Sequence, residues 1–153
     1  MASVRILVSD TDFDTGQEIS DLLQRSGEGA GGLGAFVGVV RGGSGLQSLT
    51  LEHYPGMTER ILEGLVLEAV GRFSLSGCTV IHRVGCMNVG ERIVLVLTAS
   101  AHRAEALDAV RFLIDRLKTG APFWKKEHYE DGAGSWVDAR EADDWAAARW
   151  DTA

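Results

Sequence analysis

Three lysines in the last third of the chain are close enough in sequence to form one reactive or anion-binding group. Lys118, Lys125 and Lys126 flank the segment Ala-Pro-Phe-Trp at 121–124. Closely spaced ammonium groups lower one another's pKa, and partial burial acts in the same direction, so such a cluster can supply a nucleophile or an acid/base near neutral pH. The same lysines also fit a solvated surface, with Lys118 as a favourable cation at a helix C-terminus. Both interpretations stay open on these residues alone.

Four further cationic side chains extend the set: Arg41, His102, Arg103 and Arg140. Such a group binds anions and stabilises developing negative charge. The formal net charge of the chain is -7, so the local sign of this group is opposite to that of the molecule. The sequence therefore predicts a site for an anionic ligand.

Other kinds of site are not indicated. The histidines are scattered without the short spacings of zinc sites, so we expect a structural or solvated role for each: His53, His82, His102 and His128. Cys78 and Cys86 do not form a Cys-x-x-Cys pair, which argues against a disulfide framework or a thiolate metal site. We expect Cys78 in a buried strand and Cys86 in a turn, and we predict neither a metal site nor a resident cofactor.

Two motif-like stretches are set aside. Gly29 to Gly34 fits Gly-x-Gly-x-x-Gly, but it leads into a strand-like run, whereas dinucleotide binding requires a strand before the glycines and a helix after them. We expect a flexible connection there. Ser100 and His102 have the spacing of helix capping, and no oxyanion motif accompanies them.

The elements that position these residues follow from periodicity. Strands are predicted over 4–8, 35–40, 48–54, 78–84, 93–98 and 135–139, and helices over 15–24, 58–73, 102–117 and 141–150. Thr15 and Glu18 form a capping box for the first helix, and Ser100 can cap the third. We expect strands 35–40 and 48–54 to form a hairpin and strands 78–84 and 93–98 to form an antiparallel pair. The fold class is α+β, a largely antiparallel sheet with packed helices, in a single domain over 1–153.

The third helix separates two cation groups. Its length places His102 and Arg103 over 20 Å from Lys118, at roughly 1.5 Å per residue. The groups can share a ligand only if the chain after Gly120 folds back along the helix, or if a second subunit supplies one of them. Pro122 prevents the helix from continuing, so residues 123–128 are expected to be extended, with Lys125 and Lys126 on opposite sides.

The composition argues against several classes of protein. With 153 residues, 45% hydrophobic and 24% charged, the chain has ordinary globular values. It has neither an apolar run of roughly 20 residues nor a signal-peptide pattern, so we expect no membrane span and a cytoplasmic location. The acidic balance argues against nucleic-acid binding, which requires a basic surface.

Six strings in the same order resemble the large (catalytic) subunit of molybdopterin synthase. They are Phe36-Val-Gly-x-Val-Arg41, Leu49-Thr-Leu-Glu-His-Tyr-Pro-Gly-Met57, Ile81-His-Arg-Val-Gly85, Ser100-Ala-His-Arg103, Leu117-Lys-Thr-x-Ala-Pro-Phe-Trp-Lys125 and Trp136-Val-x-Ala-Arg140. The resemblance runs from about Gly34 to Trp150, while residues 1–33 match weakly and support only a strand and a helix. It implies a hammerhead-like α/β fold.

The resemblance also implies an activity and partners. The family forms a dimer that binds two copies of a small ubiquitin-like sulfur-carrier subunit, giving a heterotetramer. The carrier's C-terminal Gly-Gly thiocarboxylate delivers sulfur to cyclic pyranopterin monophosphate, and two sulfur atoms make the dithiolene of molybdopterin during molybdenum cofactor biosynthesis. Neither cysteine of this chain is placed as a sulfur donor, which agrees with an external source.

Residue roles carry over by position. Lys118 matches the lysine expected to act on the substrate as acid/base or transient covalent partner, and Lys125 matches the lysine expected to hold the thiocarboxylate end or the intermediate. The expected substrate-binding residues are Arg41, His102, Arg103, Lys126, Glu127 and Arg140, the last adding charge from the same or a neighbouring subunit. The chain departs from the family in the short loop 42–45 and at Gly120, where a basic residue is common.

A rival hypothesis is a non-catalytic dimeric module that docks a ubiquitin-like tail or an anionic metabolite without turnover. The presence of both Lys118 and Lys125 favours the enzyme, because docking alone does not require paired lysines.

Overall fold

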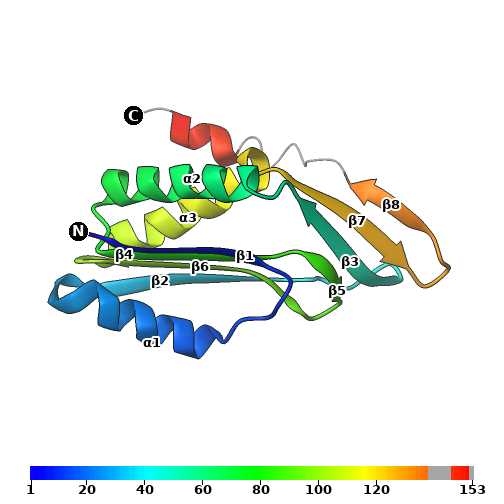
Figure 1. Cartoon of the computed structure of the whole chain (residues 1–153), viewed down its shortest axis with the longest axis horizontal. Coiled ribbons are helices and arrows are strands. Elements are labelled where there is room, and N and C mark those ends of the chain that lie inside the picture. The colour runs from blue at the N-terminus through cyan, green and yellow to red at the C-terminus, as the bar shows by residue number, and fades with distance from the viewer. Residues whose placement is uncertain (138–145, 152–153) are drawn as a thin grey trace.

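A computed structural model of the chain describes residues 1–137 and 146–151. The elements are, in order, β1 (Ser3–Ser9), α1 (Thr15–Ser26), η1 (Gly27–Gly29), β2 (Gly32–Val39), β3 (Leu46–His53), α2 (Met57–Phe73), β4 (Gly77–Arg83), β5 (Gly85–Asn88), β6 (Arg92–Ser100), α3 (Arg103–Gly120), β7 (Phe123–Tyr129), β8 (Gly134–Val137) and η2 (Arg149–Asp151) (Figure 1). The predicted α+β class is confirmed. Within the described residues, no helix is long and apolar enough to cross a membrane.

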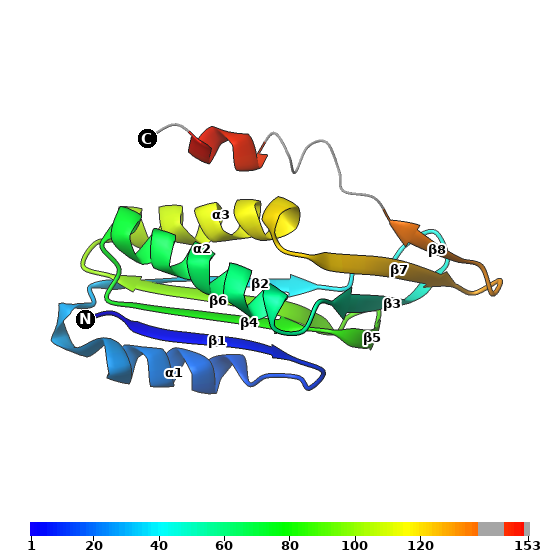
Figure 2. The same cartoon turned by 45° about the horizontal axis from the view of Figure 1, so that its top comes forward.

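In the described part of the chain, the strands form two four-stranded sheets. The first sheet has the order β1-β4-β6-β2, and only its β1–β4 pair is parallel. The second sheet has the order β5-β3-β7-β8 and is antiparallel throughout. Helices α2 and α3 cover one face of the first sheet and α1 covers the other, while the second sheet extends beyond the helices (Figures 1 and 2).

Both faces of the first sheet are therefore buried, which explains the nearly continuous apolar character of β4 and β6. Cys78 and Val80 of β4 pack toward α2 and α3, whereas Ile81 packs toward α1. A third cluster belongs to the second sheet and consists of Val40, Leu49, Leu51 and Met87. Cys78 is buried in a strand as predicted, but Cys86 lies exposed in β5 and not in a turn.

The strand pairing was predicted correctly in one case and wrongly in the other. β4 and β6 form the expected antiparallel pair, with Val80 opposite Val96. The hairpin of 35–40 with 48–54 is wrong, because β2 pairs with β6 whereas β3 pairs with β5 and β7. Leu33 and Val37 of β2 pack into the cluster under α1, which holds this strand in the first sheet.

The glycine-rich passage is not a flexible connection, since Gly32 and Gly34 lie in β2. A Cβ atom on Gly34 would lie 2.7 Å from the carbonyl oxygen of Ala106 and 2.8 Å from Cγ2 of Val110. Glycine at this position lets the strand approach the backbone of α3.

Two helix starts differ from the expected ones. Asp14 caps α1, with its Oδ1 accepting a hydrogen bond from the backbone N–H of Gln17 at 3.0 Å, so Thr15 is the first helical residue and not the cap. Ser100 ends β6, and its hydroxyl donates to the carbonyl of Ser74 at 3.4 Å instead of capping α3. Of the predicted terminal helix 141–150, residues 141–145 lie outside the described part, and residues 146–148 are helical.

Candidate active site

The connection between α3 and β7 positions both candidate catalytic lysines. Lys118 lies in the last turn of α3. Ala121 is extended, with φ -89° and ψ 136°, as expected for a residue that precedes proline. The N–H of Phe123 then donates to the carbonyl of Ala121 at 2.9 Å, which makes a tight turn around Pro122. Lys118 therefore comes from a helix end and Lys125 from the strand that follows this turn.

Thr58 holds the turn in place from the first part of α2. Its side chain is fully buried. Its hydroxyl oxygen accepts a hydrogen bond from the N–H of Tyr54 at 3.0 Å and donates to the carbonyl of Pro122 at 3.3 Å. The β3–α2 connection and the α3–β7 connection are thus joined through one threonine.

The register of β7 against β3 separates Lys125 from Lys126. Lys125 lies opposite Leu51, which is 2% exposed, and Lys126 lies opposite Thr50. Directly opposite residues share a face, so Lys125 lies on the side of the third cluster and Lys126 on the other side. There the Lys126 Nζ lies 5.8 Å from the ring centroid of Trp136. The prediction that the two lysines point to opposite sides is confirmed.

His82 lies at the meeting point of the two sheets. Its ring is stacked on that of Phe123, with centroids 3.9 Å apart and an angle of 18° between the planes. Burial lowers the pKa of His82, and the charges of Lys125, His53 and Lys118 add to this shift, which brings the pKa to about 4 in all. Lys118 and Lys125 are therefore both close enough to this one histidine for their charges to act on it.

His53 adds a carboxylate to this cluster. Its Nε2 lies 3.9 Å from Oε1 of Glu59, and Oε2 of Glu59 accepts a hydrogen bond from the N–H of Gly56 at 3.4 Å. Sequence reasoning missed both His53 and His82 as members of a site. The available signal was the alternation of β4, which places His82 on the same face as Val80, toward α2 and α3.

Glu127 is a further predicted residue on the same side of β7 as Lys125. It lies two residues further along β7 and accepts a hydrogen bond from the Tyr129 hydroxyl. This bond raises the pKa of Tyr129. Arg41 is exposed and directly follows Val40, which packs in one cluster with Leu51, the partner of Lys125.

His102 and Arg103 lie at the other end of α3. The helix has 18 residues, so its ends are separated by about 25 Å at 1.5 Å per residue. β7 does not fold back along α3 but continues away from it into the second sheet, so the first of the two alternatives for bringing the cation groups together does not apply (Figures 1 and 2). A single chain therefore keeps His102 and Arg103 apart from Lys118. Arg140 lies outside the described residues.

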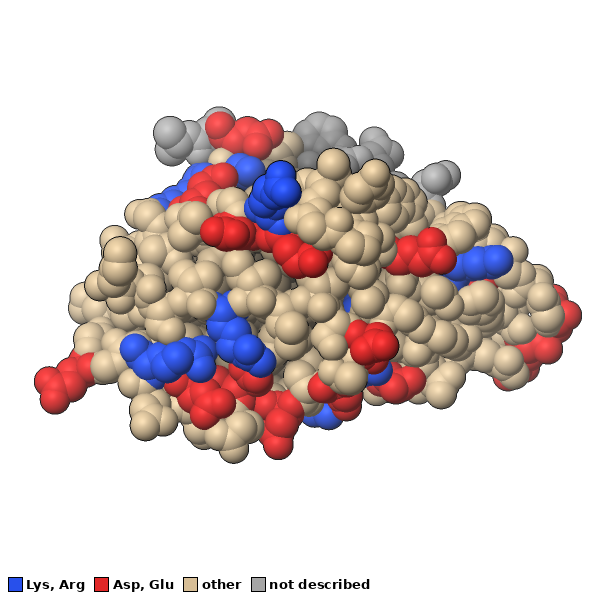
Figure 3. All heavy atoms as spheres, in the orientation of Figure 1, with Lys and Arg blue, Asp and Glu red and all other residues tan. Residues whose placement is uncertain are grey.

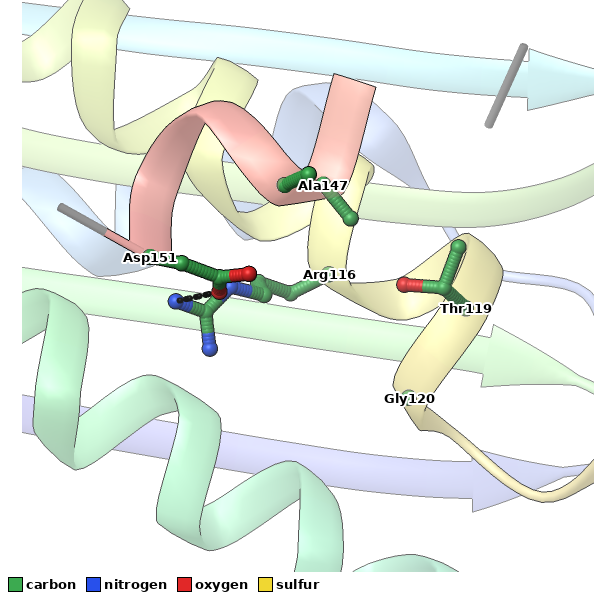
Figure 4. Close-up of a pocket in the computed structure, with 6 residues that line it drawn as sticks. Arg116, Thr119, Gly120, Ala147 and Asp151 are labelled. Carbon is green, nitrogen blue, oxygen red and sulfur yellow. Dashed lines mark ion pairs between the residues drawn. The ribbon is translucent and has the colours of Figure 1, made fainter. Parts of the chain in front are cut away.

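A cavity of about 270 Å³ lies between the end of α3 and the C-terminal segment (Figure 4). Arg116 and Asp151 form an ion pair of 3.5 Å at this cavity, and Thr119 and Gly120 also line it. None of the predicted site residues in the described part lines this cavity. The candidate site is instead the surface where the two sheets meet.

The surface of the molecule carries charges of both signs. On the face seen in Figure 3, acidic and basic side chains are interspersed and do not form a large basic surface. Among the residues that the structure describes, no group of three or more histidine, cysteine, aspartate or glutamate side chains is arranged to hold a metal ion.

The two antiparallel-dominated sheets and their packed helices place the chain among the α+β proteins, with one lysine at the end of α3 and the other in the following strand β7. The chain belongs to the family described as MoaE protein, whose model matches residues 8–120.

Similar proteins support this assignment. The chain is 50% identical over 151 residues to a "Molybdopterin synthase catalytic subunit" of Rhizobium meliloti strain 1021, covering 97% of each protein. It is similar to the solved structure of a molybdopterin biosynthesis MoaE protein from Burkholderia ambifaria, with a TM-score of 0.83, 43% identity and full coverage of both chains. The fold also matches, at 21% identity and a TM-score of 0.70 over 90% of each chain, a complex of subunits 1 and 2 of the molybdopterin-converting factor from Helicobacter pylori.

Proposed function

We propose that this chain is the catalytic subunit of a molybdopterin synthase. It transfers sulfur from the C-terminal thiocarboxylate of a small carrier subunit to cyclic pyranopterin monophosphate in molybdenum cofactor biosynthesis. Membership of the family and the name of the Rhizobium relative support the activity. The observation that carries it is that the charges of Lys118 and Lys125, on two elements joined by one turn that Thr58 holds, both act on His82.

The two lysines have separate roles in this proposal. Lys118 acts on the substrate as acid/base or transient covalent partner. Lys125 holds the thiocarboxylate end, where its ammonium group offsets negative charge. Each transfer forms one carbon–sulfur bond at a substrate carbon that loses a carbon–oxygen bond. The acyl carbon–sulfur bond of the carrier is hydrolysed, so that the carrier leaves with a C-terminal carboxylate. Glu127 lies on the face of Lys125 and Lys126 on the other face, so we assign Lys126 the smaller part in substrate binding.

The substrate phosphate and pterin require cations that one chain does not bring to Lys118. We propose a homodimer in which the partner copy supplies His102 and Arg103, and Arg140 adds charge. The support is the span of α3 together with the course of β7 away from it. With one carrier on each copy, the assembly is a heterotetramer; the word "subunit" in the relative's name agrees with an assembly of unlike chains.

The proposed transfer requires only the carrier and the substrate, with no resident cofactor. A cytoplasmic location is part of the proposal. Activity in the presence of a chelator tests the first statement, and cell fractionation tests the second.

A direct assay tests the function. The purified chain is mixed with a thiocarboxylated carrier and cyclic pyranopterin monophosphate, and the product is examined by mass spectrometry. We expect the addition of two sulfur atoms. A carrier that binds without any sulfur transfer would instead indicate the docking module.

A further inference from the structure

His82 is held by two contacts that fix its ring. One is the stacking on Phe123, at 3.9 Å between centroids. The other joins Nδ1 to the carbonyl oxygen of Arg83 at 2.9 Å. Because a carbonyl oxygen only accepts hydrogen bonds, Nδ1 carries the proton. In the neutral ring, Nε2 is therefore left with a lone pair.

The surroundings of His82 keep this ring neutral. Its pKa is lowered to about 4, mainly by burial and also by charged groups from three elements: Lys125 of β7, His53 of β3 and Lys118 of α3. The carboxylate of Glu59 lies beyond His53, 3.9 Å from its Nε2. At neutral pH the ring is thus a hydrogen-bond acceptor among cations and adds no positive charge to them.

Phe123 contacts the His82 ring and lies on the same strand as Lys125. It is the partner of His53 across β3 and β7, and it lies two residues before Lys125 on the same face of β7. A lysine side chain is flexible, with four carbon atoms between the backbone and the charge, and a site that requires one direction of this charge must restrain it. The imidazole of His82, held against Phe123, offers Nε2 as a hydrogen-bond acceptor that can restrain the Lys125 ammonium group.

We propose that His82 is a positioning residue for sulfur transfer, whose Nε2 accepts a hydrogen bond from the Lys125 ammonium group when carrier and substrate are bound. The proposal rests on the function proposed above and adds a residue to it. An uncharged acceptor orients the lysine without the repulsion that a third cation beside Lys118 and Lys125 would introduce.

Two substitutions of His82 distinguish the effect of its hydrogen-bond acceptor from the effect of its stacking on Phe123. His82→Phe keeps an aromatic ring on Phe123 and removes both ring nitrogens, whereas His82→Gln can place an amide oxygen near the position of Nε2. The control is His128→Gln, because His128 lies on the other face of β7 and bonds to Thr50 at 2.9 Å. Single-turnover sulfur transfer is measured at saturating substrate, together with KM and the thermal midpoint.

We expect His82→Phe to lower the transfer rate at least about tenfold with KM and the thermal midpoint little changed, a loss typical of one misplaced catalytic hydrogen bond. His82→Gln should recover most of the rate, and His128→Gln should equal the wild type. A His82→Phe rate equal to that of the wild type would overturn the proposal, as would equal losses in the Phe and Gln variants.

Nitrogen NMR of histidine-labelled protein gives a second reading that does not depend on turnover. Nε2 of His82 should stay unprotonated at pH 6 to 8 and change its shift when carrier and substrate are added to the wild type but not to Lys125→Ala. No shift change in the wild type would contradict the proposed bond. A wild-type protein without transfer activity would refute the proposed function itself, and is distinguished by the mass-spectrometric assay.

Discussion

The indole Nε1 of Trp150 donates a hydrogen bond to the carboxylate of Asp115 at 2.7 Å, and so joins the C-terminal segment to α3. The indole also makes edge-to-face contacts with Phe73 and Phe112, at 5.9 and 5.6 Å between centroids. Arg72 donates to the Trp150 carbonyl at 2.8 Å. One residue therefore connects the end of the described chain to both α2 and α3.

Replacing Trp150 should lower the free energy of unfolding in two steps. Trp150→Phe removes the hydrogen bond to Asp115 and keeps most of the ring, for a loss of about 1 kcal/mol. Trp150→Ala also removes the aromatic contacts, for a loss of about 3 kcal/mol. Chemical denaturation measures both values. Equal stability of Trp150→Ala and the wild type would show that this packing contributes nothing.

Replacing either proposed catalytic lysine should abolish molybdopterin formation, and for Lys118 this should happen without loss of carrier binding. We expect Lys118→Ala and Lys125→Ala each to lower turnover by about 100-fold or more, as removal of a charge that stabilises the transition state does. Lys126→Ala should cost less than about tenfold, because its side chain lies over Trp136 on the other face. Turnover is measured by mass spectrometry and carrier binding by calorimetry. Unchanged turnover of Lys118→Ala would refute its role.

Hybrid dimers test whether the partner copy supplies Arg103. Arg103→Ala and Lys118→Ala should each be inactive, but co-expression places them in one dimer with one intact site. With random pairing, activity should recover to about a quarter of the wild-type value. Co-expression of Lys118→Ala with Lys125→Ala is the matched control, since both lysines act in the same pocket and no intact site forms. Recovery in the control, or none in the test pair, would contradict the arrangement.

The stability of the protein should depend on pH through His82. Its pKa is about 4 in the folded chain, below the ordinary value near 6.5, so the unfolded chain binds the proton more tightly. The stabilisation is complete above pH 6.5 and is lost as the pH falls toward 4, by up to about 3 kcal/mol. Denaturation of the wild type and of His82→Phe between pH 4 and 7 measures this. The same pH dependence in both proteins would show that His82 is not its source.

Two glycine substitutions test why β2 lies against α3. A methyl group at Gly34 would lie 2.7 Å from the Ala106 carbonyl, so Gly34→Ala should destabilise the fold by about 1–3 kcal/mol. Gly64 lies in α2, and a Cβ atom there meets nothing within 4 Å. Gly64→Ala should therefore stabilise the protein by about 0.5–1 kcal/mol. Chemical denaturation of the two variants compares them, and a stable Gly34→Ala would contradict the close approach.

Local patterns were sufficient for much of the fold and for the direction of the lysines. The two-residue alternation of a strand after Pro122 places Lys125 and Lys126 on opposite faces, whichever strands lie beside it. The partner of β2 could not be found in this way. The hairpin rule favours neighbours in sequence, whereas the apolar side chains of Leu33 and Val37 require a place under α1.

The histidines of the site were missed for a similar reason. His53 and His82 come from different strands and meet beside Phe123 only because β3 pairs with β7 and because β4 ends where the second sheet begins. Spacing rules detect pairs within one element, and no such pair exists here. The position of Gly34 was likewise hidden, because a glycine required by a close helix reads in sequence like a glycine in a loop.

Helix α3 carries Lys118 at one end and Arg103 at the other. In the proposed dimer its length sets the distance between the two cation groups of each chain and hence the offset between the two active sites. Insertion of four residues in the middle of α3 would move one end by about 6 Å and turn it by about 40°. The proposed dimer therefore constrains the length of α3 as well as its amino-acid sequence.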